Sequence, residues 1–221
     1  MPSEVNNRNG VNMNYFNLII HPVQFFKQLI TKEKISLLIP AFILILIGIL
    51  SGLIAGNAVS TINMGIAEDQ MSMIKGITIG TGIFSGIIGL VLTVVIKAGI
   101  FNFILNKMGG AGKFKTAVYV VSLAYFPKIF QSILNLIFQH PINLTTTYKF
   151  DWVAFLGSIF SIFNIWQIFI TIIGLSVVYG LSYKKTAIPV IGMEILSAGF
   201  TLGTSLVAAN SMASLSNTSI K

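Results

Sequence analysis

The sequence has 221 residues, of which 54% are hydrophobic and only 9% are charged. Soluble domains carry about 25% charged residues, so the composition excludes an ordinary soluble enzyme, and the high hydrophobicity excludes a disordered chain. The sequence therefore predicts an all-α, polytopic membrane helical bundle. It holds no cysteine, which excludes disulfides and cysteine–metal sites. The net charge of +8 is typical of loops that face a negatively charged cytoplasmic membrane surface.

Residues 15–34 form an amphipathic segment ahead of the first apolar stretch. The pair His21-Pro22 predicts a break, and residues 23–31 are predicted as a short helix. Two placements are open for this helix: it lies in the headgroup layer, or it packs on the membrane bundle. Residues 1–14 are polar and are predicted to be a disordered tail.

Five apolar stretches are long enough to cross a bilayer, which takes about 20 residues. They cover residues 35–56, 76–105, 117–138, 152–181 and 187–209. The second and fourth are longer than one crossing needs, which predicts a tilted span or an interfacial extension. The predicted membrane domain is therefore 35–209, followed by a loose Ser/Asn-rich tail over 210–221.

Basic residues in the loops predict the orientation of the chain. Nine lie on one side of the predicted membrane: Arg8, Lys27, Lys32, Lys34, Lys107, Lys113, Lys115, Lys184 and Lys185. The other side has only Lys75, Lys149 and Lys221, with three acidic residues nearby. Because Lys and Arg favour cytoplasmic loops, the N-terminus is predicted in the cytoplasm and the C-terminus outside the cell membrane.

Glycines recur at four-residue spacing in three of the stretches. The first stretch has Gly48, Gly52 and Gly56 on one helical face. The second has Gly76 with Gly80 and Gly82 with Gly86, and the fifth has Gly199 with Gly203. This spacing allows close helix packing in lipid. We expect internal packing faces, with homodimer contacts as the alternative.

Polar residues inside the stretches are the candidate binding residues. Lys128, Gln131 and Asn135 share one helical face, and so do Ser161, Asn164, Gln167 and Thr171. Glu194 lies nine residues beyond Lys185, roughly 13 Å along a helix. Lys97 differs, since it is expected near the cytoplasmic interface, where a lysine can snorkel.

Two interpretations of these residues are open. In one, Lys128, Glu194 and the amides line a polar pathway or substrate site. In the other, Lys128 pairs with Glu194 and the amides only join helices. Pro127 breaks the third stretch just before Lys128 and frees backbone groups there, which supports the first interpretation.

No catalytic, cofactor or metal site is predicted. Both histidines, His21 and His140, lie outside the apolar stretches, and there is no HExxH or P-loop pattern. The run Gly109-Gly110-Ala111-Gly112 resembles a phosphate cradle, but it joins two apolar stretches and no strand precedes it. A tight cytoplasmic turn is the favoured reading.

Several local patterns, in order, resemble the Yip-domain family. They are the His21–Leu29 entry, the Gly109, Gly110 and Gly112 turn with its basic run, Tyr125 followed by Pro127, and the stretch from Trp166 through Gly174 to Tyr179-Gly180-Leu181. The resemblance covers roughly residues 22–195. It implies a five-span membrane protein with a cytoplasmic N-terminus and no catalytic residues.

The resemblance also implies a function class. Eukaryotic members act in vesicle trafficking and have a long cytoplasmic N-terminal region, whereas only about 34 residues precede the first stretch here. The chain looks more like a bacterial-type member, and bacterial relatives are similar to accessory membrane subunits that accompany ABC-type exporters. We therefore predict a non-enzymatic scaffold or accessory subunit whose partners are the bilayer and either exporter subunits or a second copy, with no nucleic acid. The alternatives are a small transporter or channel that uses the polar seam, and a membrane-shaping or trafficking factor.

Overall fold

The computed structural model describes residues 15–31, 35–60, 67–138 and 151–218, in which the regular secondary structure is helical and no strand occurs. The helices are α1 (Asn17–Ile20), α2 (Pro22–Ile30), α3 (Leu38–Ser60), α4 (Glu68–Lys107), α5 (Phe114–Ala124), α6 (Phe126–Ile137), α7 (Trp152–Ile159), α8 (Ile162–Tyr179) and α9 (Tyr183–Thr218). The prediction of an all-α fold is confirmed. The predicted tail over residues 1–14 lies outside the described residues.

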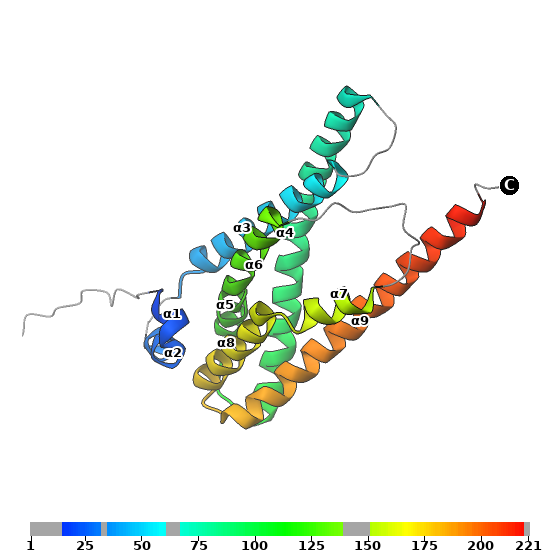
Figure 1. Cartoon of the computed structure of the whole chain (residues 1–221). Coiled ribbons are helices and arrows are strands. Elements are labelled where there is room, and N and C mark those ends of the chain that lie inside the picture. The colour runs from blue at the N-terminus through cyan, green and yellow to red at the C-terminus, as the bar shows by residue number, and fades with distance from the viewer. Residues whose placement is uncertain (1–14, 32–34, 61–66, 139–150, 219–221) are drawn as a thin grey trace, which may run out of the picture.

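Five segments are long and apolar enough to cross a membrane, as predicted. They are Leu38–Val59, Glu68–Lys107, Phe114–Ile137, Trp152–Tyr179 and Tyr183–Val207. The second begins eight residues before the expected start at Gly76. At the other end of the chain, α9 continues to Thr218, so most of the segment expected to be loose is helical. Figure 1 shows the last part of α9 extending away from the other helices.

Two of the five spans are interrupted. The third is divided at Tyr125 between α5 and α6, with Pro127 in the first turn of α6. Proline has no N–H and cannot continue the α5 ladder, so this break follows the prediction. The fourth is divided at Phe160 and Ser161 between α7 and α8. That break was not predicted, since a tilted span or an interfacial extension was expected there.

The glycines of α3 lie against α4. A Cβ at Gly52 would lie 2.6 Å from the backbone nitrogen of Ile83, and a Cβ at Gly82 would lie 3.0 Å from the Cα of Gly52. Gly48 and Gly56 make similarly close approaches to isoleucines of α4. The two backbones therefore meet directly along this seam, as small residues allow in lipid.

Two other glycine pairs do not pack against any of the described residues. Gly76, Gly80, Gly199 and Gly203 have no heavy atom within 4 Å of where a Cβ would lie, counting the part of the chain that the structure describes. The expectation of internal packing is therefore wrong for these four. Four-residue spacing defines a face of a helix, but it does not determine whether a neighbour reaches that face.

The N-terminal helices pack on the bundle. Phe25, Phe26 and Leu29 of α2 are completely buried, and a Cβ at Gly174 of α8 would lie 2.8 Å from Cζ of Phe26. Of the two placements left open by the sequence, the structure shows packing on the bundle. Gly174 is required here because any side chain would collide with the Phe26 ring.

The glycine turn after α4 packs against the end of α8. The ring of Tyr179 lies against Gly110 and Gly112, so that a Cβ at either glycine would meet it. The backbone N–H of Ala111 donates to the carbonyl of Tyr179 at 3.2 Å, and the Tyr179 hydroxyl donates to Asn102 Oδ1 at 2.8 Å. Gly109 has a φ of +93°, which favours glycine. This geometry fits the favoured interpretation of residues 109–112 as a tight turn.

Candidate functional site: an intramembrane polar cluster

The fifth span is tied to the second by an ion pair. Lys97 Nζ of α4 lies 2.6 Å from Glu194 Oε1 of α9. Lys97 is ten residues from the end of α4, roughly 15 Å at the helical rise. Its side chain is 7% exposed, whereas that of Glu194 is 30% exposed. The expectation that Lys97 snorkels to the interface is therefore wrong, because the Glu194 carboxylate holds it inside the bundle.

Lys128 has different partners from those expected. Its Nζ donates to Gln131 Oε1 at 2.9 Å and to Asn164 Oδ1. The predicted ion pair between Lys128 and Glu194 is absent among the described residues, since Glu194 is bonded to Lys97. The charges of Lys97 and Glu194 nevertheless lie near enough to act electrostatically on Lys128. The cluster thus holds two lysines and one glutamate.

Asn164 connects the two broken spans. Its Oδ1 accepts from Lys128 in the first turn of α6, while its Nδ2 donates to the carbonyls of Ser158 and, at 3.2 Å, of Ile159 at the end of α7. Its backbone N–H donates to the side chain of Ser161, which caps α8. One side chain therefore satisfies backbone groups at the α7–α8 break and the ammonium beside the α5–α6 break, as lipid-buried irregular backbone requires.

A pocket of about 190 Å³ opens beside the α7–α8 break. Its polar lining comes from three helices: Ser158, Asn164, Gln167, Glu194, Ser197 and Thr201. Gln167 is buried and is hydrogen-bonded to the hydroxyl of Tyr125 at the α5–α6 break. Asn164, Gln167 and Glu194, three of the predicted binding residues, are thus brought together at one site.

Other predicted residues lie outside the pocket. Gln131 contacts Lys128, as described above, and Asn135 is exposed one turn further along α6. Thr171 is buried and donates to the carbonyl of Gln167 at 2.8 Å, so it serves α8 itself. Pro127 is buried at the start of α6.

Sequence reasoning missed three lining residues: Ser158, Ser197 and Thr201. A signal for two of them was present. Glu194, Ser197 and Thr201 follow the same i, i+3, i+7 spacing that selected the other polar faces. Ser158 carried no such signal, because it belongs to the helix that ends at the unpredicted break.

The cluster can bind and orient polar groups within the membrane. Among the described residues, no group of three or more His, Cys, Asp or Glu side chains is placed to hold a metal ion. What the lining offers is a carboxylate, two amides and three hydroxyls. Inserting a charged side chain at this depth costs about 2.5–3.5 kcal/mol on insertion scales. The position of Glu194 beside a pocket therefore marks a candidate functional site.

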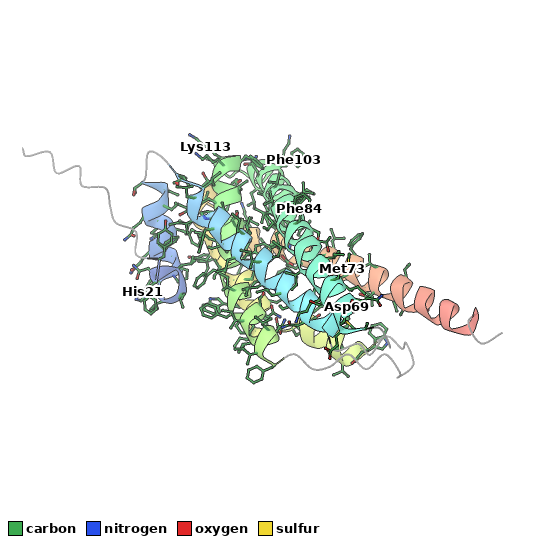
Figure 2. All side chains as sticks on the ribbon, turned by 90° about the horizontal axis from the view of Figure 1, so that it is seen from above. His21, Asp69, Met73, Phe84, Phe103 and Lys113 are labelled. Carbon is green, nitrogen blue, oxygen red and sulfur yellow. The ribbon has the colours of Figure 1, made fainter. Side chains whose placement is uncertain are left out.

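Figure 2 places Asp69 and Lys113 near opposite ends of the bundle. A family model described as the Yip1 domain matches residues 16–205. Comparisons with curated proteins and with solved structures each gave no significant match. The match spans most of the chain and covers all five candidate spans almost completely. The protein therefore belongs to the Yip1 domain family.

Proposed function

We propose that this protein is a non-enzymatic membrane scaffold or accessory subunit that binds a helix of another membrane protein through its fifth span. The observation that carries this proposal is the outward face of α9. Gly192, Gly199 and Gly203 have no atom of the described residues within 4 Å of a Cβ position. The equivalent glycines of α3 are in close contact with α4.

The two faces of α9 have opposite character. Glu194 and Thr201 are seven residues apart and line the pocket against α7 and α8. Gly192 and Gly199 are also seven residues apart, but they lie about half a helical turn around from the first pair. In lipid, small residues favour close approach of another helix. The open glycine face is therefore suited to a partner span.

The proposed partner is a membrane subunit of an ABC-type exporter in the cell membrane. This choice follows the similarity to bacterial Yip-domain proteins that accompany such exporters. A second copy of this chain is the competing partner, and the experiment below separates the two.

The test is affinity purification from native membranes in mild detergent, followed by identification of the co-purifying membrane proteins. The full chain is compared with a variant carrying Gly199→Leu and Gly203→Leu. We expect an exporter membrane subunit to co-purify with the wild type and to be lost from the variant. The matched control carries Gly76→Leu and Gly80→Leu, equally open glycines on α4, and should retain the partner.

Recovery of self-association alone would contradict the accessory role and favour a homodimer. Equal recovery of the exporter subunit with both double variants would show that α9 is not the binding face. Thermal unfolding of each variant in the same detergent checks that the comparison concerns folded protein.

A second candidate function is a small transporter or channel. It is favoured by the meeting of two interrupted spans at a polar pocket, since discontinuous helices form the substrate sites of many transporters. Proteoliposomes test it: Glu194→Gln and Lys128→Gln should each abolish flux while the helical content persists. Absence of flux in the wild type would indicate that the cluster only joins the helices to one another.

The proposed orientation has the N-terminus in the cytoplasm and the C-terminus outside. In support of this, the turn after α4 and the turn after α8 touch, since Ala111 donates to the carbonyl of Tyr179. The lysines of both turns therefore gather at one end of the bundle. Such an accumulation is typical of the cytoplasmic side.

A further inference from the structure

The pocket beside the α7–α8 break is rich in hydrogen-bond acceptors. The hydroxyls of Ser158, Ser197 and Thr201 donate to carbonyls of their own helices, at 2.7, 2.8 and 2.9 Å. A hydroxyl has one donor and two acceptor sites. With the donors used within the helices, these side chains present lone pairs to a bound group.

The Lys97–Glu194 ion pair presents its negative member to the pocket. Among the described residues that line it, Glu194 is the one ionisable side chain. Lys97 holds Oε1 of that carboxylate and is nearly buried, whereas Glu194 is 30% exposed. The lysine thus lies on the protein side and the carboxylate on the pocket side. A carboxylate has about four lone-pair sites, so Glu194 can accept from a second cation while it keeps Lys97.

The donors of Asn164 and Lys128 are already engaged. Both contacts of Asn164 Nδ2 are with carbonyls at the end of α7, and Lys128 lies outside the lining, bonded to amide oxygens. An anion in this pocket would meet the Glu194 carboxylate directly. A group with several N–H donors and a positive charge would match the lining instead.

We propose that this pocket binds the protonated primary amine of a small amine or an amine-bearing amphiphile, with the ammonium hydrogen-bonded to Glu194 and to the hydroxyls of α9. The apolar part of the lining comes from Ile159, Ile168 and Ala198 and would contact the adjoining methylenes. This inference goes beyond the scaffold function and does not rest on it, because the pocket and the open glycine face lie on opposite sides of α9.

The test uses the full chain in detergent and three probes of equal chain length: octylamine, octanol and octanoate. A ligand that binds only the folded state raises the unfolding temperature. We expect octylamine to raise it more than octanol does, and octanoate to have no specific effect. Ethylamine is added as a fourth probe. If it acts like octylamine, the ligand is a free amine, and if only octylamine acts, the ligand is an amphiphile of the membrane.

Variants locate the binding. Thr201→Val removes one hydroxyl without touching the ion pair and should weaken octylamine binding, measured by calorimetry. The paired change Lys97→Met with Glu194→Gln removes both charges of the ion pair together, so that neither member is left without the other. This variant keeps Lys128 but lacks the Glu194 carboxylate, and it should weaken octylamine binding by about tenfold or more, since a hydrogen bond to a charged group is being lost.

A change at Lys128 tests whether the pocket prefers a cation or an anion. Removing its positive charge in Lys128→Gln should tighten a cation site, whereas it would loosen an anion site. The proposal is overturned if octylamine and octanol act alike, if the double variant Lys97→Met with Glu194→Gln binds octylamine unchanged, or if octanoate is the tighter probe. Weaker octylamine binding by Lys128→Gln would likewise overturn it.

Discussion

Lys97 and Glu194 are 97 residues apart in the chain, and their side chains meet at 2.6 Å between the second and fifth spans. Little hydrophobic drive acts between helices in lipid, so polar contacts of this kind matter for the position of α9. The last part of α9 leaves the bundle (Figure 1). The ion pair is therefore a principal tie of this span to α4.

A double-mutant cycle tests this tie. Lys97→Met and Glu194→Gln each leave one polar group without its partner. Removing one member of a buried pair costs about 3–5 kcal/mol. We expect about 2 kcal/mol of unfolding free energy here, because Glu194 is partly exposed and groups in lipid find other partners. The double variant should regain most of the loss, measured by unfolding in mixed micelles.

Lys115→Met is the matched control, since Lys115 is exposed in the first turn of α5. It should leave the unfolding free energy unchanged. Strictly additive losses in the double variant would show that Lys97 and Glu194 do not stabilise the fold through each other.

Asn164 gives a second prediction. Asn164→Leu leaves the Lys128 ammonium with one acceptor fewer and the carbonyls at the end of α7 without their side-chain donor. Unsatisfied buried groups cost about 1–3 kcal/mol each, so we expect a loss of about 2 kcal/mol or more. Asn164→Asp should lose less, because it keeps an acceptor for Lys128. Asn135→Leu, at an exposed position of α6, is the control. Equal stability of Asn164→Leu and Asn135→Leu would contradict the connecting role.

The five spans could be predicted because hydropathy over about 20 residues reports directly on transfer into lipid. The break at Tyr125 could also be predicted, since Pro127 carries its own local signal. The break at Phe160 and Ser161 could not. No proline or glycine occupies those two positions, and the break is stabilised by the side chain of Asn164, a contact that becomes visible only in three dimensions.

Which charged residues pair could not be predicted from the sequence, for a related reason. Lys97 and Lys128 both lie in apolar stretches, and either could reach a glutamate in another span. Which lysine meets Glu194 depends on the rotation and packing of α4, α6 and α9. The same limit applies to the glycine faces. Spacing identified the faces of Gly48 and Gly199 alike, but within the described part of the chain only Gly48 has a close neighbour.

The α3–α4 seam gives a third prediction. Gly52→Ala would place a Cβ 2.6 Å from the backbone nitrogen of Ile83 and 2.8 Å from the carbonyl oxygen of Ile79. Backbone atoms cannot rotate away, so the helices must separate, at a cost of about 1–3 kcal/mol. Gly80→Ala is the control, since that position is open. It should be neutral or stabilising by about 0.5–1 kcal/mol. The opposite ranking in thermal unfolding would show that the seam tolerates separation.

The orientation gives the fourth prediction, and the chain suits its test because it has no cysteine of its own. Lys184→Cys and Asp69→Cys each introduce a single thiol at an exposed position near opposite ends of the bundle. With the N-terminus in the cytoplasm, a membrane-impermeant maleimide should label Asp69→Cys in intact cells. It should label Lys184→Cys only after the membrane is opened. The reverse labelling pattern would mean that the orientation is inverted. The lysines near the turns after α4 and α8 would then lie outside the cell, against the usual distribution of basic residues.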